Sequence, residues 1–361
     1  GDQTQLTSPD TGITNKTYDE AGNLRTSIDA RNQQTTYTYD AINRVTGMSY
    51  TSGAPIGFSY DQGINGTGRL TGMSDESGST QWTYDAQGRV VSKTVTTGAL
   101  TQVLRYRYDA QGRLNQLTYP SGKSDALAYQ ANKIGSISAD NQPVLAGVQY
   151  HPFSGPKLWF FGNNSVVNRN YDQSNRLYAY NLGNATRSLS FDDTGRISNI
   201  ADSLNSGLTQ NMGYDNLDRL TSWVTGNANQ SFGYDANGNR TSLTIGASGY
   251  SNSIAPTSNR LNAISGPTAK TYGYDNAGNI QTDSRNTFVY NARGRLNSVS
   301  NSSGTETYQI NGLGQRVVKS GLINVRFVYD EGGKLIGEYT PSGALIQETV
   351  YLGDLPVAVL R

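Results

Sequence analysis

The stretch Tyr106-Arg107-Tyr108-Asp109-Ala110-Gln111-Gly112-Arg113-Leu114 recurs in variant forms along the whole chain. Other clear copies are Tyr84-Asp85 to Val90 and Tyr171-Asp172 to Leu177. With the tyrosine or its substitute as the marker, the copies are spaced by ~21 residues, a period typical of repeat architectures. We therefore interpret the chain as a repeat protein of about sixteen units.

Each unit predicts two antiparallel strands joined by a turn. Before the aspartate, Tyr106 and Tyr108 alternate with polar residues and would share one face of a strand. Asp109 can accept hydrogen bonds from the backbone just ahead, and Gly112 can take the positive φ that such a loop requires. This spacing predicts a hairpin with a bulge. A second turn signal ~10 residues later, such as Pro120-Ser121-Gly122, indicates an all-β fold.

The residues that define the repeat are the tyrosine, the aspartate, the glycine and the arginine of each turn, and we expect their role to be structural. They are Tyr39, Asp40, Arg44, Tyr84, Asp85, Gly88, Arg89, Tyr108, Asp109, Gly112, Arg113, Tyr171, Asp172, Arg176, Tyr214, Asp215, Arg219, Tyr234, Asp235, Gly238, Tyr274, Asp275, Gly278, Tyr329, Asp330 and Gly333.

The repeats predict one continuous array over residues 1–361, with degenerate units near 125–165. In that region Tyr150-His151-Pro152 replaces the usual turn, and three adjacent aromatic residues follow at 159–161. We expect burial against the sheet, rather than a binding partner, to explain those aromatics. The interval from Tyr274 to Tyr290 is shorter than the others, which predicts a clipped turn. A helical period is sustained nowhere, so very little helix is expected.

Composition limits the function classes. Lys+Arg 29 against Asp+Glu 28 gives a net charge of +1, so nucleic acid and anionic membranes are not expected partners. The chain has no cysteine, which excludes disulfides, and no apolar run long enough for membrane insertion. Apolar residues make up 35% of the sequence, enough to cover a sheet face but not to fill a thick core throughout.

Reactive side chains are sparse. His151 is the only histidine, so a serine–histidine–aspartate triad or a histidine-rich metal site has almost nothing to draw on. The loops at 235–239 and 275–279 lack the further ligands and closing glutamate of a calcium loop. The recurring arginines are better explained by cross-strand pairs with aspartate and by stacking on tyrosine rings than by phosphate binding. We therefore expect no enzyme activity, catalytic residue, metal or cofactor.

The repeated Tyr-Asp turn with its Gly-Arg ending resembles the Rhs or YD repeats of bacterial Rhs polymorphic toxins, insecticidal toxin complex C components, wall-associated proteins and teneurins. The resemblance implies tandem hairpins forming one long antiparallel sheet that spirals into a hollow shell, or part of one. A twisted ribbon of so many strands cannot stay flat, which agrees with this. The implied function is the wall of a shell that encapsulates or carries a C-terminal toxin effector.

The resemblance also places an N-terminal plug, a closing region and the effector outside this chain, as its own partners, and no self-cleaving residue is assigned. A secretion-system component or a cell-surface glycan is a further expected partner, and the expected location is secreted or cell-surface. An extracellular adhesin that binds a carbohydrate or a receptor through outward-facing tyrosines stays open as an alternative. A β-propeller of four-stranded blades is the architectural alternative.

Overall fold

The structure is a computed structural model that describes residues 2–153, 155–226 and 228–361. Its regular elements are 36 β-strands and a single turn of 3-10 helix, η1 (Ser206–Leu208), with no α-helix among the described residues. The strands belong to antiparallel sheets of 26 and 10 strands. The all-β prediction is confirmed, and sheets of this length exclude a propeller of four-stranded blades. The chain divides into two compact units, residues 1–126 with 272–361 and residues 127–271.

Unit 1 contains two runs of consecutive hairpins. The first run is β1 (Gln5–Ser8), β2 (Gly12–Tyr18), β3 (Leu24–Ile28), β4 (Gln34–Tyr39), β5 (Val45–Tyr50), β6 (Ile56–Tyr60), β7 (Leu70–Asp75), β8 (Gly78–Tyr84), β9 (Val90–Thr97), β10 (Leu100–Tyr108), β11 (Leu114–Thr118) and β12 (Ser124–Gln130), whose last residues reach into unit 2. The second run is β27 (Gly273–Tyr274), β28 (Ile280–Thr282), β29 (Thr287–Tyr290), β30 (Leu296–Asn301), β31 (Gly304–Ile310), β32 (Arg316–Ser320), β33 (Val325–Tyr329), β34 (Leu335–Tyr339), β35 (Leu345–Leu352) and β36 (Leu355–Leu360).

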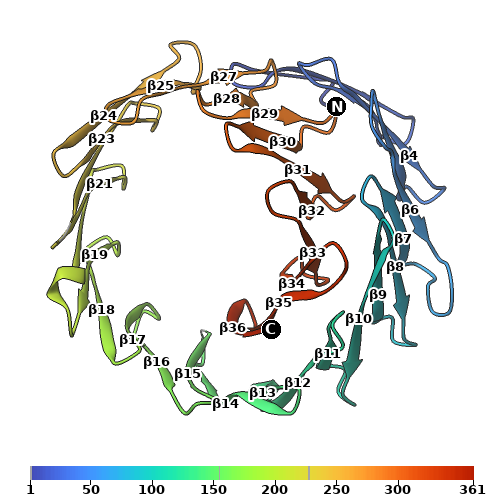
Figure 1. The fold of residues 1–361 in the computed structure, drawn as a ribbon, viewed down its shortest axis with the longest axis horizontal. Coiled ribbons are helices and arrows are strands. Elements are labelled where there is room, and N and C mark those ends of the chain that lie inside the picture. Colours follow the sequence, from blue (N-terminus) through green and yellow to red (C-terminus); the bar gives the residue numbers. More distant parts are fainter. Residues whose placement is uncertain (1, 154, 227) are drawn as a thin grey trace. The chain divides into compact units, whose positions relative to one another are not determined.

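The two runs of unit 1 pack against each other (Figure 1). Their main cluster joins Leu104 and Tyr106 of β10 to Val328 of β33 and to Ile336 and Tyr339 of β34. All five are at most 7% exposed. Burial of large apolar side chains between sheet faces is the principal stabilising contribution available to such a thin fold. The same apolar cluster therefore stabilises both hairpin runs of unit 1.

Close packing of the layers requires a glycine at position 312. A Cβ atom there would lie 2.7 Å from Sδ of Met73 and 2.9 Å from Cγ2 of Ile56. The Gly312 backbone N–H donates to Oδ2 of Asp75 at 2.7 Å, and the Ile310 N–H donates to Oε1 of Glu76 at 3.1 Å. The turn after β31 is thus seated directly on the β6–β8 part of the other run.

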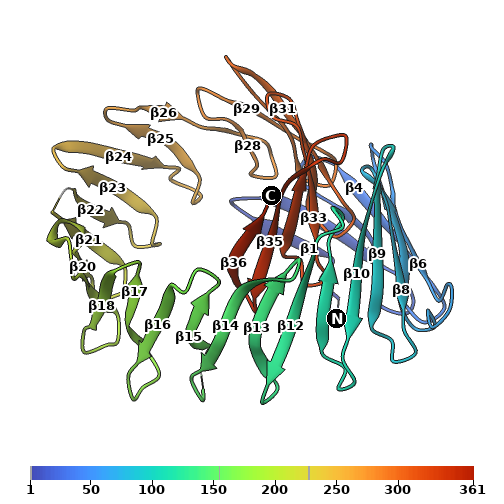
Figure 2. The same cartoon turned by 60° about the horizontal axis from the view of Figure 1, so that its bottom comes forward.

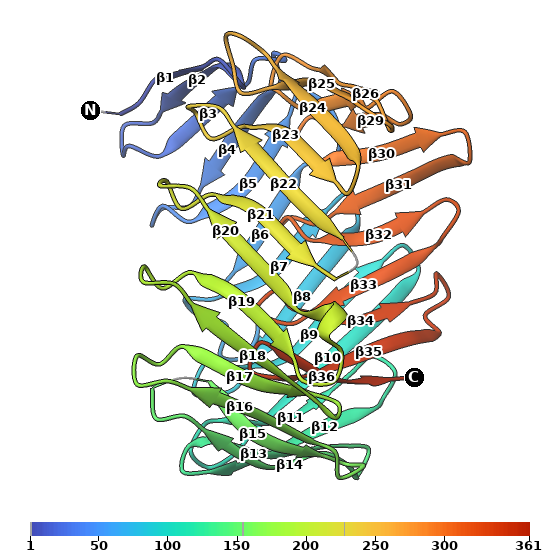
Figure 3. The same ribbon diagram turned by 90° about the vertical axis from the view of Figure 1, so that its left-hand side faces the viewer.

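Unit 2 is a meander of short antiparallel strands (Figures 2 and 3). Its strands are β13 (Lys133–Ala139), β14 (Gln142–Tyr150), β15 (Pro156–Phe161), β16 (Val166–Tyr171), β17 (Leu177–Leu182), β18 (Ala185–Phe191), β19 (Ile197–Asp202), β20 (Gln210–Tyr214), β21 (Leu220–Thr225), β22 (Asn229–Tyr234), β23 (Arg240–Ile245), β24 (Ser248–Ile254), β25 (Leu261–Ser265) and β26 (Lys270–Thr271). Each pairs with the next along the chain, as in β17–β18 and β22–β23.

Two regions that looked irregular in the sequence are irregular in the structure. Among the three adjacent aromatics, Trp159 is buried at 3% exposure, whereas Phe160 points to the other face and is 43% exposed. The burial expected of the aromatic run thus holds for Trp159 and not for Phe160. The shortened interval before Tyr290 contains short strands, with two, three and four residues in β27, β28 and β29. The turn at Asp275 has its full length, with the Asp275 N–H donating to the Asn279 carbonyl, so the strands are shortened where a clipped turn was predicted.

Candidate functional site

The repeat turn is held by the aspartate carboxylate. In the copy at Asp109, Oδ1 accepts from the backbone N–H groups of Gln111 and Arg113 at 3.0 and 2.9 Å. Oδ2 accepts from Nε of Arg113 at 2.7 Å, and Gly112 has φ of +82°. The ladder register shifts between Arg107 and Tyr108, which is the predicted bulge. One carboxylate therefore satisfies the loop backbone and fixes the arginine at the same time.

The arginine then contacts the next repeat. The guanidinium of Arg89, paired with Asp85, lies over the ring of Tyr108 at 4.3 Å from the centroid. The hydroxyl of Tyr108 in turn donates to the carbonyl of Val90 at 2.8 Å. The ring is thus clamped between an arginine and a carbonyl of the preceding unit. We call this aspartate–arginine–tyrosine connection the inter-repeat relay, exemplified by Asp85, Arg89 and Tyr108.

The relay recurs along both units. The tyrosine hydroxyl bonds join Tyr39 to Leu24 (2.8 Å), Tyr84 to Leu70 (2.5 Å), Tyr214 to Ile197 (2.8 Å), Tyr234 to Leu220 (2.8 Å) and Tyr329 to Arg316 (2.9 Å). The ion pairs within turns are Arg44–Asp40 (2.6 Å), Arg176–Asp172 (2.8 Å) and Arg219–Asp215 (2.7 Å). The arginine–ring contacts include Arg44–Tyr60 (4.3 Å), Arg176–Phe191 (4.4 Å) and Arg219–Tyr234 (4.8 Å).

Some copies replace one member. Oδ2 of Asp235 and Oδ2 of Asp275 accept from asparagine side chains, Asn239 at 2.9 Å and Asn279 at 2.8 Å. Oδ1 of Asp330 accepts from the backbone N–H of Lys334 at 2.8 Å. The position three residues after the aspartate has positive φ in these copies and others, including Gly88, Gly238, Gly278, Gly333, Asn43, Asn175 and Asp218. The turn backbone is therefore retained although the side chains vary.

The pattern differs from the predicted pairing in one respect. The aspartate and the arginine close the same hairpin loop, with Asp109 N–H donating to the Arg113 carbonyl, and only the ring belongs to another hairpin. Hydrogen bonds from the Arg44 backbone and guanidinium hold the pKa of Asp40 below its ordinary value. The same donors from Arg219 lower the pKa of Asp215. Both carboxylates therefore keep their charge well below neutral pH.

Two polar clusters in unit 1, one around the buried Lys93 and one around the buried Glu348, are not part of the repeat motif. Glu331, in the turn after β33, accepts from Nε1 of Trp82 at 2.9 Å and from the hydroxyl of Tyr106 at 3.3 Å. Lys93 is 4% exposed, lies 3.6 Å from Glu331 and donates to the carbonyl of Tyr329 at 3.1 Å. Burial lowers the pKa of Lys93. This cluster attaches the β33–β34 turn to β8, β9 and β10.

The second cluster surrounds Glu348 of β35, which is 0% exposed. Its carboxylate accepts from the Tyr339 hydroxyl at 2.5 Å and from the Ser121 hydroxyl at 2.7 Å. Nearby, the Tyr119 hydroxyl lies 3.0 Å from Oδ2 of Asp125 and 3.2 Å from the Thr349 carbonyl. A buried charge is costly to leave unpaired, so the buried carboxylate of Glu348 and the buried ammonium of Lys93 each favour the facing of strands that gives them partners.

The remaining chemistry is sparse. The imidazole of His151 packs against the ring of Tyr171 at a tilt of 40°, with centroids 5.1 Å apart. Within the described ranges, no three histidine, cysteine, aspartate or glutamate side chains gather as a metal-binding group. None of the described residues forms a helix of the length and apolarity needed to cross a membrane.

Comparisons with known proteins agree with the repeat motif. Residues 158–307 match the teneurin YD-shell family model, and residues 18–55, 65–100 and 93–124 match the RHS repeat model. No curated protein sequence matches the chain significantly.

Solved toxin-complex structures share the fold. The chain is similar to one in the Tc holotoxin pore of Photorhabdus luminescens with a TccC3 variant, at a TM-score of 0.79 and 14% identity, covering 99% of this chain and 24% of that one. Against the crystal structure of TcdB2-TccC3 the TM-score is 0.78 at 15% identity, covering 99% and 25%. The chain thus spans about a quarter of the length of these relatives. The family models thus identify RHS repeats within residues 18–124 and a YD-shell over residues 158–307, and the solved toxin-complex chains share the fold.

Proposed function

We propose that the chain is a segment of the wall of a YD-repeat shell that encloses or carries a polypeptide effector, without catalysis of its own. The observation that carries the proposal is the inter-repeat relay. Each aspartate, arginine and tyrosine of the Asp85–Arg89–Tyr108 type is engaged in joining one hairpin to the next. The side chains that define the repeat are therefore used to join its hairpins.

The kinship supports the same role. One matching family model is described as a YD-shell, and the similar solved chains come from toxin assemblies that contain TccC3. On this proposal the partners of the segment are the remaining regions of its own polypeptide, namely a plug, a closing region and the enclosed effector, and a secretion-system component for export. The proposed location is secreted or cell-surface.

Protease protection tests the enclosure. The complete polypeptide that carries these repeats is treated with proteinase K in native buffer and after denaturation, and the surviving peptides are identified by mass spectrometry. We expect peptides from outside the repeat sequence to survive only in native buffer. Digestion of those peptides at the same rate in both conditions would overturn the proposal.

A wall variant connects the protection to the relay. The double variant Arg89→Ala with Tyr108→Ala removes one relay and is expected to speed digestion of the enclosed peptides. The matched control is Arg107→Ala, an exposed arginine on the same hairpin whose side chain makes no hydrogen bond, ion pair or ring contact among the described residues. If the enclosed peptides were digested at the same rate in the relay variant and in the control, protection would not depend on the contact between Arg89 and Tyr108.

A further inference from the structure

The turn at residues 291–295 departs from the relay. Asn291 occupies the aspartate position, and its Oδ1 accepts from the backbone N–H of Arg295 at 3.0 Å, so the turn backbone is retained. In the turn at Asp40, by contrast, the carboxylate also pairs with Nε of Arg44 at 2.6 Å. Arg295 therefore has no carboxylate partner in its own turn.

The next unit offers Arg295 no aromatic ring. Ile310 stands at the position where Tyr108 receives the guanidinium of Arg89. The side chain of Arg295 makes no hydrogen bond, ion pair or ring contact with any residue that the structure describes. A Cβ atom on Gly314 would lie 3.5 Å from its Nη2. The guanidinium thus lies beside the following turn with its N–H donors unpaired by those residues.

A second arginine lines the same cavity, whose volume is about 260 Å³. Nη1 and Nη2 of Arg293 donate to the carbonyls of Ile310 and Asn311, each at 2.9 Å. These bonds hold the side chain in place, and they leave it further N–H donors and its full charge. Among the described residues, no acidic side chain lines this cavity. Two guanidinium charges therefore line it without a carboxylate.

The first hairpin run contributes tyrosines to the cavity. Tyr37 is partly buried, and its hydroxyl makes no hydrogen bond in the described part of the chain. Burial raises the pKa of Tyr37, so the hydroxyl keeps its proton and remains a donor. The hydroxyl of Tyr50 reaches only Sδ of Met48, at 3.6 Å. Cationic groups of one run thus share the cavity with hydroxyl groups of the other.

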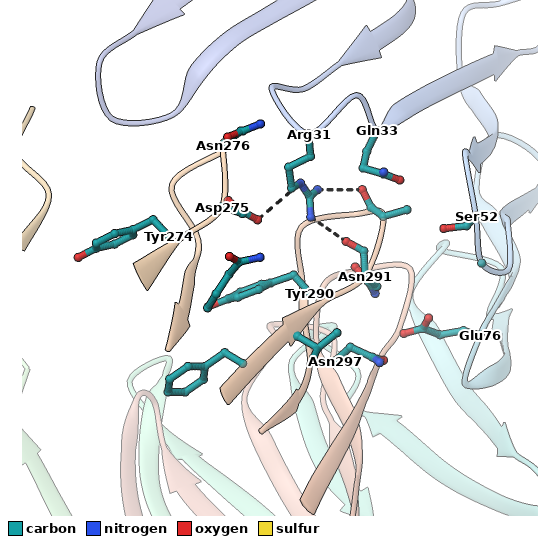
Figure 4. A pocket seen from close by; sticks show the side chains of 15 residues that line it. Arg31, Gln33, Ser52, Glu76, Tyr274, Asp275, Asn276, Tyr290, Asn291 and Asn297 are labelled. Carbon is teal, nitrogen blue, oxygen red and sulfur yellow. Dashed lines mark hydrogen bonds and ion pairs between the residues drawn. The ribbon is translucent and has the colours of Figure 1, made fainter. Parts of the chain in front are cut away.

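The neighbouring cavity around Arg31 has the opposite charge balance (Figure 4). Nη2 of Arg31 pairs with Oδ2 of Asp29 at 2.6 Å, and Oδ2 of Asp275 lies 3.9 Å from its Nε. Glu76 lines that cavity too and accepts from the Ile310 N–H at 3.1 Å. An anion would meet several carboxylates there, whereas the smaller cavity offers it two arginines and no acid.

We propose that the cavity at Arg293 and Arg295 binds a phosphate group. The forked N–H donors of arginine match the oxygens of phosphate, and the hydroxyl of Tyr37 adds a neutral donor. A cavity of about 260 Å³ is smaller than the usual site for a whole organic ligand. It suits a single phosphate, either as the free anion or as the end of a larger molecule. The site is independent of any enclosed effector.

Phosphorus NMR of the ligand tests the class of ligand with the purified chain. Inorganic phosphate and phenyl phosphate are titrated separately at constant ionic strength, and saturable line broadening is measured. We expect inorganic phosphate to bind. Binding of the free anion alone would identify it as the ligand, and binding of the monoester as well would identify the end of a larger molecule. Saturable binding of neither would overturn the proposal.

Removal of the unpaired guanidinium tests the location. Arg295→Ala is expected to weaken phosphate binding by about tenfold, because it removes charge-assisted hydrogen bonds. The matched control is Arg105→Ala, an exposed arginine of β10 outside the cavity that likewise makes no bond with a described residue. Because neither side chain is bonded, both variants should fold as the native chain does, which circular dichroism checks.

A second variant restores the carboxylate of the other turns. Asn291→Asp should capture Arg295 as Asp40 captures Arg44, and it should weaken phosphate binding by about tenfold without disturbing the fold. Asn216→Asp is its control, since it adds the same charge at an exposed turn outside the cavity. An affinity equal to that of the control in either cavity variant would overturn the site.

Discussion

Trp82 and Glu331 lie 249 residues apart in the sequence, yet the indole Nε1 of one donates to the carboxylate of the other at 2.9 Å. The same carboxylate is 3.6 Å from the ammonium of Lys93, which is buried at 4% exposure. A turn residue of one hairpin run therefore neutralises a cation embedded in the other. The contact shows that the two layers of unit 1 are aligned by specific polar bonds in addition to apolar packing.

Removing the carboxylate should destabilise unit 1. Glu331→Ala removes the ion-pair partner of the buried Lys93 ammonium, which keeps its bond to the Tyr329 carbonyl, and removes the acceptor of the Trp82 N–H. We expect a loss of about 1 to 3 kcal/mol in the free energy of unfolding. Urea denaturation followed by tryptophan fluorescence measures it. Glu20→Ala, at an exposed turn position, is the control and should change little. Equal stability of the two variants would show that the Lys93 charge does not depend on Glu331.

The carboxyl of Asp125 predicts a pH effect of unusual sign. It is 5% exposed, and burial raises its pKa from 3.8 to about 6. Between those values the folded chain holds a proton that the unfolded chain has released, so the Asp125 contribution to stability falls as the pH rises through that window. The full decline is on the order of 3 kcal/mol.

Asp125→Asn removes this titration. The turn aspartates such as Asp40 have lowered pKa values and act in the opposite direction at lower pH, so the comparison must be between the native chain and the variant. We expect the stability of the native chain relative to the variant to be higher at about pH 4.5 than at about pH 7.5. Urea midpoints at the two pH values measure it. A difference independent of pH would contradict a raised pKa at this carboxyl.

The relay predicts coupling between neighbouring repeats. Arg89→Ala and Tyr108→Leu should each destabilise the fold, and their combined effect should be smaller than the sum by about 0.5 to 1.5 kcal/mol, because either change alone breaks the same contact. A double-mutant cycle from chemical denaturation measures the coupling. Arg107→Ala with Tyr108→Leu supplies the control cycle, for which additivity is expected.

The close approach at Gly312 predicts a steric effect. Gly312→Ala would place a methyl group against Met73 and Ile56 and should cost about 1 to 3 kcal/mol of stability. Gly249→Ala is the control, since a Cβ there would meet no atom within 4 Å. Thermal unfolding compares the two variants. A Gly312→Ala chain as stable as the control would show that the β31–β32 turn can move away from β6 and β7.

The repeat turn could be predicted from the sequence, whereas the packing of one hairpin run on the other could not. The turn from Tyr106 to Leu114 is predictable because its aspartate, glycine and arginine interact with one another within a few residues. Glu331 occupies a turn position that the motif leaves variable, and Lys93 and Glu348 lie outside the turn. Each of the three has a partner more than 200 residues away. Which repeats face each other depends on the accumulated twist of many strands, which no local pattern encodes.

The region before Tyr290 shows an intermediate case. The shortened interval is visible in the sequence, but the structure shortens the strands β27, β28 and β29, while the turn at Asp275 keeps its full length. Two facts about Tyr290 follow only from the structure: its hydroxyl makes no hydrogen bond with a described residue, and it lines the same cavity as Arg31 of the first hairpins. The departure from the repeat period was thus the one available signal. It shows where the repeat is irregular, but it does not show which side-chain contacts change there.

The relay also bears on how such a chain can change in length. Because Arg89 and Val90 recognise only the next tyrosine, a whole unit can be duplicated or lost without altering any other joint, as in other linear arrays with nearest-neighbour contacts. The bond between Trp82 and Glu331 imposes the opposite constraint, because it spans a fixed number of units. Gain or loss of one hairpin between Trp82 and Glu331 would bring a different turn to Trp82. The number of hairpins between these two residues is therefore constrained, although the individual joints between repeats do not constrain it.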